Sequence, residues 1–271
     1  MSQCCIIVQM EKIIIGPDNP VLSARLHNWH DQGGWYFGAG DPEFWQFSNE
    51  LLKPGGKLLD IGIGLGRSSF YFAAHGMDVL GVDTDESRVA DVNQMAAELK
   101  GVMPFDMKAL RLDALQEDLP EGLFDTIIIG QVVHIESKQA AFDLFDKALA
   151  ALKPGGHIWV RGAGKESYAY EELSYYAYSG LQPSYKFIDN DVIEHPCNCS
   201  GEDLIEPTLF FDPLDLSSFF ASRGCTIVHS QTIPTEDKMN IMYGEDYNPD
   251  YPNPMGGMVT VMARKPLNRP S

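Results

Sequence analysis

The glycine-rich segment DIGIGLG, residues 60–66, has the residue types of a nucleotide-binding loop. It directly follows an apolar run that is predicted to be a strand. Glycines let a ligand approach the backbone closely, and the N-terminus of the helix expected next favours anionic groups. Asp83 stands about 20 residues after Gly62, where a carboxylate can bond both hydroxyls of a ribose. The glycine-rich loop, the strand before it and the spacing to Asp83 together predict a nucleotide site.

The elements that must position these residues alternate between strands and helices. Strands are predicted at residues 57–61, 78–83, 107–112, 124–130 and 157–162. Helices are predicted at residues 67–75, 85–100 and 137–152, the last two with the capping residues Asp85 and Ser137. This alternation is typical of a parallel sheet covered by helices on both faces, so the fold class is α/β. A capped helix at 212–223 and strands at 226–233 and 258–264 complete the pattern.

Two segments interrupt this pattern in the last part of the chain. Residues 163–207 show no clean periodicity and contain six tyrosines, and residues 187–222 hold eight acidic residues without a Lys or Arg. Residues 234–257 are rich in Pro, Asn, Asp and Tyr, which predicts a loop. We expect one domain over 45–271, with an insertion after the fifth strand, preceded by a lid or cap segment over 1–44.

Charge and composition exclude several classes of protein. The chain has 271 residues and a formal charge of −18, which disfavours nucleic acid as a partner. No apolar run approaches the roughly 20 residues that span a bilayer, and the N-terminus lacks the features of a secretory signal. Five sparse cysteines indicate a reducing compartment, so we expect a cytoplasmic protein. The acidity itself indicates either a well-solvated surface or an acidic cleft for a cationic substrate.

The third glycine of the loop separates two kinds of nucleotide site. The dinucleotide fingerprint G-x-G-x-x-G requires a glycine at position 67, where the chain has Arg67. The spacing here is G-x-G-x-G, with an acid two residues before the first glycine. This pattern resembles motif I of the class I S-adenosylmethionine-dependent methyltransferases. An NAD-dependent oxidoreductase is correspondingly disfavoured.

The resemblance covers about residues 45–162 and, more weakly, residues 210–264. It implies a Rossmann-like seven-stranded sheet that ends in an antiparallel hairpin, which suits the last two predicted strands. It also implies S-adenosyl-L-methionine as the cofactor. The residues that match the family's cofactor contacts are Asp60, Gly62, Gly64, Gly66, Asp83, Thr84, Asp113, Ala114, Gly130 and Gln131. Thr84 stands where the family often has a larger apolar residue, so Met103 or Leu115 is the alternative contact with the adenine.

The resemblance implies that a methyl group passes from a sulfonium to a nucleophile by in-line displacement. The protein then acts mainly by aligning the reacting atoms. We expect an enzyme that methylates nitrogen or oxygen of a small molecule, with an amine slightly favoured. Three alternatives stay open: a cofactor-binding protein without methyl transfer, a protein or peptide methyltransferase, and an enzyme that uses the cofactor for other chemistry.

Candidate residues for the acceptor substrate follow the fourth and fifth strands or lie in the flanking segments. His134 is interpreted as a catalytic base or an acceptor-orienting group, or else as a capping or packing histidine. Arg161 is interpreted as a partner for a substrate carboxylate, or else as part of a structural ion pair. Trp35 and Tyr36 are candidate lid residues or aromatic anchors. Tyr168 and its neighbours form either a cage for an ammonium group or the core of a subdomain.

The segment HPCNC, residues 195–199, is the one possible soft-metal cluster in the sequence. His195, Cys197 and Cys199 fall short of the four ligands of a structural zinc site, so no metal is expected. The expected partner is therefore a small-molecule substrate, with a homodimer as a further possibility and neither nucleic acid nor membrane involved.

Overall fold

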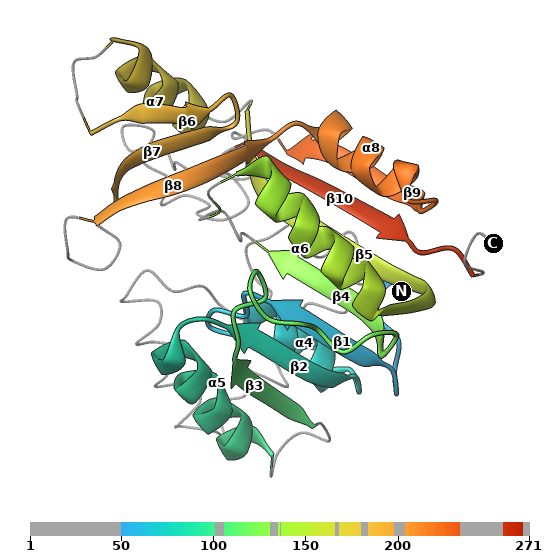
Figure 1. The fold of residues 1–271 in the computed structure, drawn as a ribbon. Helices are drawn as coiled ribbons and strands as arrows, with labels where there is room; N and C mark the ends of the chain where they lie inside the picture. Colours follow the sequence, from blue (N-terminus) through green and yellow to red (C-terminus); the bar gives the residue numbers. More distant parts are fainter. Residues whose placement is uncertain are drawn as a thin grey trace, which may run out of the picture.

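The computed structural model describes residues 50–100, 106–130, 135, 137–165, 168–179, 184–197, 204–233 and 257–267 (Figure 1). Its central sheet contains five parallel strands in the order β3-β2-β1-β4-β5. These strands are β1 (Lys57–Ile61), β2 (Asp78–Asp83), β3 (Met107–Arg111), β4 (Phe124–Gly130) and β5 (Leu152–Gly164). Two antiparallel strands, β10 (Met258–Arg264) and β9 (Thr226–Ile233), follow β5 in the order β5-β10-β9. The predicted seven-stranded sheet with a terminal hairpin is confirmed.

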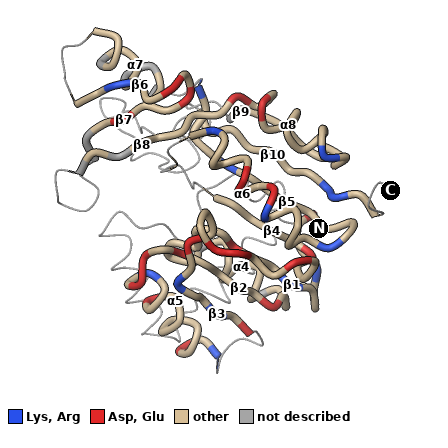
Figure 2. Tube along the Cα trace, viewed as in Figure 1, with Lys and Arg blue, Asp and Glu red and all other residues tan. Residues whose placement is uncertain are grey.

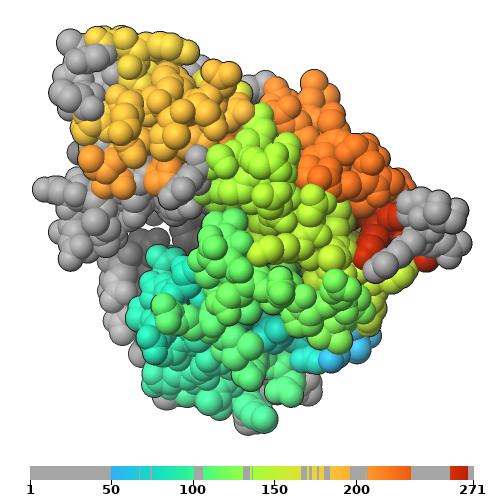
Figure 3. Space-filling model, viewed as in Figure 1, coloured from blue at the N-terminus to red at the C-terminus, as the bar shows by residue number. Residues whose placement is uncertain are grey.

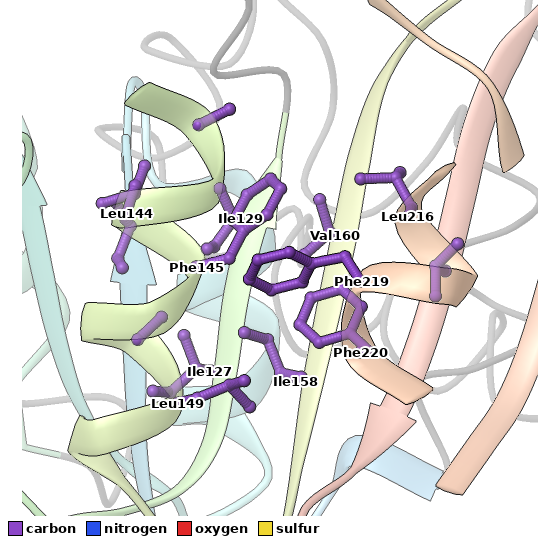
Figure 4. Close-up of a cluster of buried hydrophobic side chains, with 14 of the residues drawn as sticks. Ile127, Ile129, Leu144, Phe145, Leu149, Ile158, Val160, Leu216, Phe219 and Phe220 are labelled. Carbon is purple, nitrogen blue, oxygen red and sulfur yellow. The ribbon is translucent and has the colours of Figure 1, made fainter. Parts of the chain in front are cut away.

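Helices cover both faces of this sheet. One face packs against α4 (Arg67–Ala74) and α5 (Glu86–Leu99), in a cluster that includes Phe70 and Trp159. The opposite face packs against α6 (Lys138–Ala151) and α8 (Pro213–Ser222). Figure 4 shows side chains of β4 and β5 meeting those of α6 and α8 in this second cluster. The central strands β1, β4 and β5 therefore have two buried faces, as expected for a parallel sheet, whereas the edge strand β3 exposes Lys108.

Three side chains cap helices as the sequence predicts. Asp85 accepts hydrogen bonds from the backbone N–H groups of Ser87 and Arg88 at the start of α5. Ser137 accepts a hydrogen bond from the N–H of Ala140 at the start of α6. Asp212 accepts one from the N–H of Leu214 at the start of α8. These caps satisfy N–H groups that lack a partner within the helix, so each helix begins at a position fixed by the sequence.

The fifth strand is longer than predicted. Helix α6 ends at Ala151 and β5 begins at once with Leu152, whereas the sequence places a Pro-Gly-Gly stop there and a strand only from His157. Leu152 pairs with Phe124 of β4, and the register shifts before the next pair of residues. Local stop signals therefore locate the end of the helix, but pairing with a distant strand decides where β5 starts.

The insertion after β5 has regular structure where the sequence shows no periodicity. Its described elements are α7 (Tyr168–Ser179), β6 (Lys186–Asp189), β7 (Val192–Cys197) and β8 (Leu204–Phe211). Strands β6, β7 and β8 form an antiparallel sheet, and β8 pairs with the last two residues of β5. The insertion thus projects from the carboxyl end of the core sheet, as Figures 1 and 3 show in yellow and orange.

A group of four charged residues fastens the insertion to the core. Lys138, at the start of α6, contacts Asp191 in the turn between β6 and β7, and its Nζ lies 2.6 Å from Asp215 Oδ2 on α8. Lys165 contacts the other carboxylate oxygen of Asp191. Figure 2 shows other Asp and Glu residues, in red, on both the core and the insertion. Alternating charges therefore hold the insertion beside the ends of the core strands.

Candidate active site

A pocket of about 340 Å³ lies at the carboxyl ends of β1, β4 and β5. Ligands of open α/β sheets bind at this edge, where the order of the strands reverses; here β1 lies between β2 and β4. Five predicted site residues line the pocket, namely Asp60, Gly62, Gly64, Gly130 and Arg161. The sheet therefore brings together residues that are up to a hundred positions apart in the sequence.

The glycine-rich loop wraps closely around the end of β1. Gly62, Gly64 and Gly66 have φ angles of 76°, 52° and 74°, a conformation that favours glycine. The N–H groups of Gly62 and Ile63 both donate to the carbonyl oxygen of Val82, at 2.9 and 3.0 Å. Gly66 then precedes α4 without a side-chain cap. The loop thus lines the pocket with Gly62 and Gly64, which have no side chain, and with Ile63 and Leu65.

The carboxylate of Asp83 is fixed in position by two backbone groups. Its Oδ2 accepts a hydrogen bond from Gly64 N at 2.9 Å, and its Oδ1 accepts one from Asp85 N at 3.0 Å. A carboxylate offers about four acceptor positions, so two remain for the hydroxyls of a sugar. Asp83 is therefore tied to the glycine-rich loop and keeps the capacity that ribose binding needs.

Asp60 is a buried residue whose carboxyl group lines the pocket. The residue is only 5% exposed, and Ser69 Oγ, which is itself fully buried, donates to Asp60 Oδ2 at 2.7 Å. Burial raises the pKa of Asp60 to about 7, the Ser69 hydrogen bond opposes this rise, and the charge of Asp83 adds to it. Asp60 therefore changes its charge near neutral pH.

Replacing Asp60 by asparagine is expected to stabilise the chain increasingly as pH rises. The folded-state pKa lies above the unfolded value, so the stability contributed by Asp60 is fully present near pH 4 and is lost as pH rises through 7. Asparagine keeps an acceptor for Ser69 and carries no charge. Its stability advantage should grow by about 1–3 kcal/mol between pH 5 and pH 8.

Thermal unfolding at several pH values measures this effect. Asp91→Asn is the matched control, because Asp91 is an exposed carboxylate on α5, and its effect on the unfolding temperature should stay constant across the same pH range. An advantage of Asp60→Asn that does not change with pH would show that Asp60 is charged throughout.

Comparison with known proteins identifies the family. Residues 58–156 match the family model described as a methyltransferase domain. The chain is 32% identical over 206 residues to a ubiquinone biosynthesis O-methyltransferase of Sinorhizobium medicae, an alignment that covers 72% of this chain and 76% of that protein. The chain belongs to the class I S-adenosylmethionine-dependent methyltransferases.

Two further similarities agree with this assignment. Phosphoethanolamine N-methyltransferase 3 of Arabidopsis thaliana is 34% identical over 111 residues, which is 40% of this chain and 21% of that protein. The chain therefore matches only about a fifth of that relative's length. The crystal structure of a SAM-dependent methyltransferase from Methanosarcina mazei has a TM-score of 0.62 at 16% identity, with 82% of this chain and 98% of that chain covered. This likeness shows the Rossmann-like methyltransferase fold.

The pocket of this methyltransferase is not lined by the other described residues that are predicted to contact the cofactor, namely Gly66, Asp83, Thr84, Asp113 and Ala114. Asp113 Oδ1 accepts from Leu115 N at 3.0 Å, which closes a tight turn around the buried Ala114. The N–H of Leu112 donates to the carbonyl oxygen of Asp83 at 3.0 Å, so this turn lies beside the end of β2. Thr84 is exposed. Gly66 is the last residue of the glycine-rich loop and the N-cap of α4.

Several predicted residues lie outside the described part of the methyltransferase. These are Trp35, Tyr36, Gln131 and His134, together with the whole segment 1–44 and the loop residues 234–256. Tyr168 is the first residue of α7, in the insertion. Cys199 is outside the described residues, and His195 Nε2 lies 2.9 Å from Thr208 Oγ1. Within the described ranges, no group of three His, Cys, Asp or Glu side chains is arranged for a metal ion.

Sequence reasoning missed several residues of this site, among them Ser69, Trp159 and Arg88. Ser69 holds Asp60, and Trp159 and Arg88 line the pocket. The alternation of β5 carries a signal for Trp159, since it stands two residues before Arg161 and so faces the same side of the sheet. Ser69 and Arg88 lie on helices, where only the packing of α4 and α5 brings them to the pocket.

None of the helices that the structure describes is long and apolar enough to cross a membrane.

Proposed function

We propose that this methyltransferase transfers a methyl group from S-adenosylmethionine to nitrogen or oxygen of a small molecule, and that the pocket at the ends of β1, β4 and β5 is its active site. The hydrogen bond between Gly64 N and Asp83 Oδ2 carries the proposal, because it joins the ribose acid to the glycine-rich loop at one edge of the pocket. The pocket also suits the group chemically, since backbone at Gly62 and Gly64 leaves space that side chains would fill.

Each part of the donor has a proposed place along this edge. Asp83 would bond the ribose hydroxyls, and the turn at Asp113 and Ala114 would lie against the adenine. The loop from Gly62 to Gly66, with Gly130 and Gln131, would hold the methionine end near Asp60. The bound sulfonium supplies the activated methyl group. The protein then contributes alignment of nucleophile, methyl carbon and sulfur, which supplies about 7–11 kcal/mol in well-oriented reactions.

The acceptor would enter over the ends of β4 and β5, beside the insertion. His134 would act as a base or orient the acceptor, and a base is needed only for an acceptor that arrives protonated. Trp35, Tyr36 and Tyr168 would close or line this side. Two of the relatives are named as an N-methyltransferase of phosphoethanolamine and an O-methyltransferase of ubiquinone biosynthesis. These names support a small amine or hydroxyl as the acceptor. The sparse cysteines support a cytoplasmic location.

Transfer of a deuterated methyl group tests the proposal. The purified chain is incubated with S-adenosylmethionine labelled in its methyl group and a fractionated metabolite extract, with phosphoethanolamine tried separately, and products are searched by mass spectrometry. We expect a labelled small molecule that is absent when S-adenosylhomocysteine is added in excess. Tight donor binding without any labelled small molecule would contradict the proposal and favour a protein acceptor or a cofactor-binding role.

A further inference from the structure

Three charged residues line the pocket: Asp60 and Arg161 stand on strands of the sheet, and Arg88 stands on α5. Asp60 pairs with Ile128 of β4, which pairs in turn with Trp159 of β5, so these three residues lie at one level. Arg161 stands two residues beyond Trp159 and therefore faces the same side. Both Asp60 and Arg161 line the pocket, and both are 5% exposed. The pocket thus has an acidic side at β1 and a basic side at β5.

The strand spacing sets the width of this arrangement. Asp60 and Arg161 are separated by two strand spacings, and Asp83 and Arg161 by three, since the order is β2-β1-β4-β5. Neighbouring strands lie about 4.8 Å apart, so the backbones at Asp60 and Arg161 are about 10 Å apart along the edge of the sheet. Both residues line the same pocket, so one small molecule bound there can contact both.

The backbone around Arg161 is held on both sides. Arg161 pairs with Gly130 of β4 and with Thr260 of β10. The neighbouring Trp159 donates from its Nε1 to Thr260 Oγ1 at 2.7 Å, and both of these side chains are buried. Arginine presents its donors as a rigid planar fork that fits carboxylate and phosphate groups. The strand backbone that carries this guanidinium is therefore fixed before any ligand arrives.

Gly130 keeps the space between the two charges open on the β4 side. A Cβ atom built at this glycine would have Trp159 Cζ3 at 4.0 Å as its nearest neighbour among the described residues. Gly130 itself lines the pocket. At the level of Arg161, β4 therefore places no side chain in the pocket, whereas Ile128 of β4 lines it at the level of Asp60.

We propose that Arg161 binds a carboxylate or phosphate group of the bound ligand, whose cationic group faces Asp60. This inference rests on the proposed function and adds the class of ligand: a molecule that carries both a positive and a negative group. Two molecules of the proposed reaction supply such a pair. One is the donor, through the ammonium and carboxylate of its methionine tail, and the other is an acceptor amine that also carries an acidic group.

Donor binding distinguishes the first source. Calorimetric titration compares S-adenosylmethionine with decarboxylated S-adenosylmethionine for the wild type, Arg161→Lys and Arg161→Gln. If the donor carboxylate is bound, Arg161→Gln weakens the carboxylated donor roughly 10- to 100-fold and the decarboxylated one hardly at all, with Arg161→Lys in between. A damaged fold would weaken both ligands alike, so the ratio within one variant isolates the anion.

Methyl transfer distinguishes the second source. If Arg161→Gln leaves the affinity for both donors unchanged but lowers the rate of label transfer at limiting acceptor, the acceptor carries the anion. Arg264→Gln, which removes the same charge from the other end of the sheet, should change neither quantity. Unchanged donor affinity together with unchanged label transfer overturns the proposal for Arg161. If the wild type transfers no label, the proposed function fails. The inference about Arg161 is then tested by donor affinity alone. It is overturned if Arg161→Gln binds both donors with the affinity of the wild type.

Discussion

Replacing Asp83 by alanine is expected to weaken binding of S-adenosylmethionine about 100- to 1000-fold. The change removes two charge-assisted hydrogen bonds to the ribose, each of which contributes about 1.5–3 kcal/mol. It also removes the acceptor for Gly64 N and Asp85 N, so the glycine-rich loop loses a fixed neighbour. Isothermal titration with S-adenosylmethionine and with S-adenosylhomocysteine measures the effect, which should be similar for both because their ribose is the same.

Asp78→Ala is the matched control for this prediction. Asp78 and Asp83 are the first and last residues of β2, so the two variants remove the same charge from opposite ends of one strand. Asp78 is exposed, and its Oδ2 lies 3.7 Å from Lys57 Nζ, so its loss should leave donor affinity unchanged. Equal affinities in the wild type and Asp83→Ala would contradict the assignment of the pocket to the cofactor.

Gly81→Ala is expected to cause a large loss of stability, because Gly81 makes room for Ile63 of the glycine-rich loop. A Cβ atom at this position would lie 2.0 Å from Ile63 Cδ1 and 3.0 Å from Ile63 Cβ. Ile63 is buried between Gly62 and Gly64, so it has to move and take the loop with it. We expect the free energy of unfolding to fall by about 2–3 kcal/mol. Displacement of the loop should also weaken donor binding about 10- to 100-fold.

The same substitution at Gly130 is the control for stability. Gly130 also lies in a strand, but a Cβ atom added at this position would have its nearest neighbour at 4.0 Å. Denaturant unfolding should therefore show a marked decrease for Gly81→Ala and little change for Gly130→Ala. If both variants unfold like the wild type, Ile63 is not held against β2 as the structure shows.

The central sheet and one side of the site follow from short-range sequence signals. The loop glycines, the strand before them and Asp83 are linked by local spacing, and the structure joins them through the hydrogen bond from Gly64 N to Asp83 Oδ2. Helix starts at Asp85 and Ser137 are similarly local, since each cap needs only the two or three residues after it. Such features depend on neighbours in the chain, and a single sequence displays them.

The features that sequence analysis did not find depend on contacts between distant residues. Strand β8 forms by pairing Val192 with Leu209 and by joining β5 through Phe210 and Ala163, pairings for which no periodicity is required. The raised pKa of Asp60 arises from burial within the folded core. Arg161 was predicted as a site residue, but its relation to Asp60 appears only once the register of three strands is known.

The most direct test of the central claim is a crystal structure of the chain with S-adenosylhomocysteine. The account predicts one molecule of this product at the carboxyl ends of β1 and β4, with its ribose hydroxyls on Asp83 and its amino-acid tail over residues 62–66, reaching toward Asp60. Product bound elsewhere, or with its ribose away from Asp83, would contradict the assignment of this pocket as the methyl-donor site.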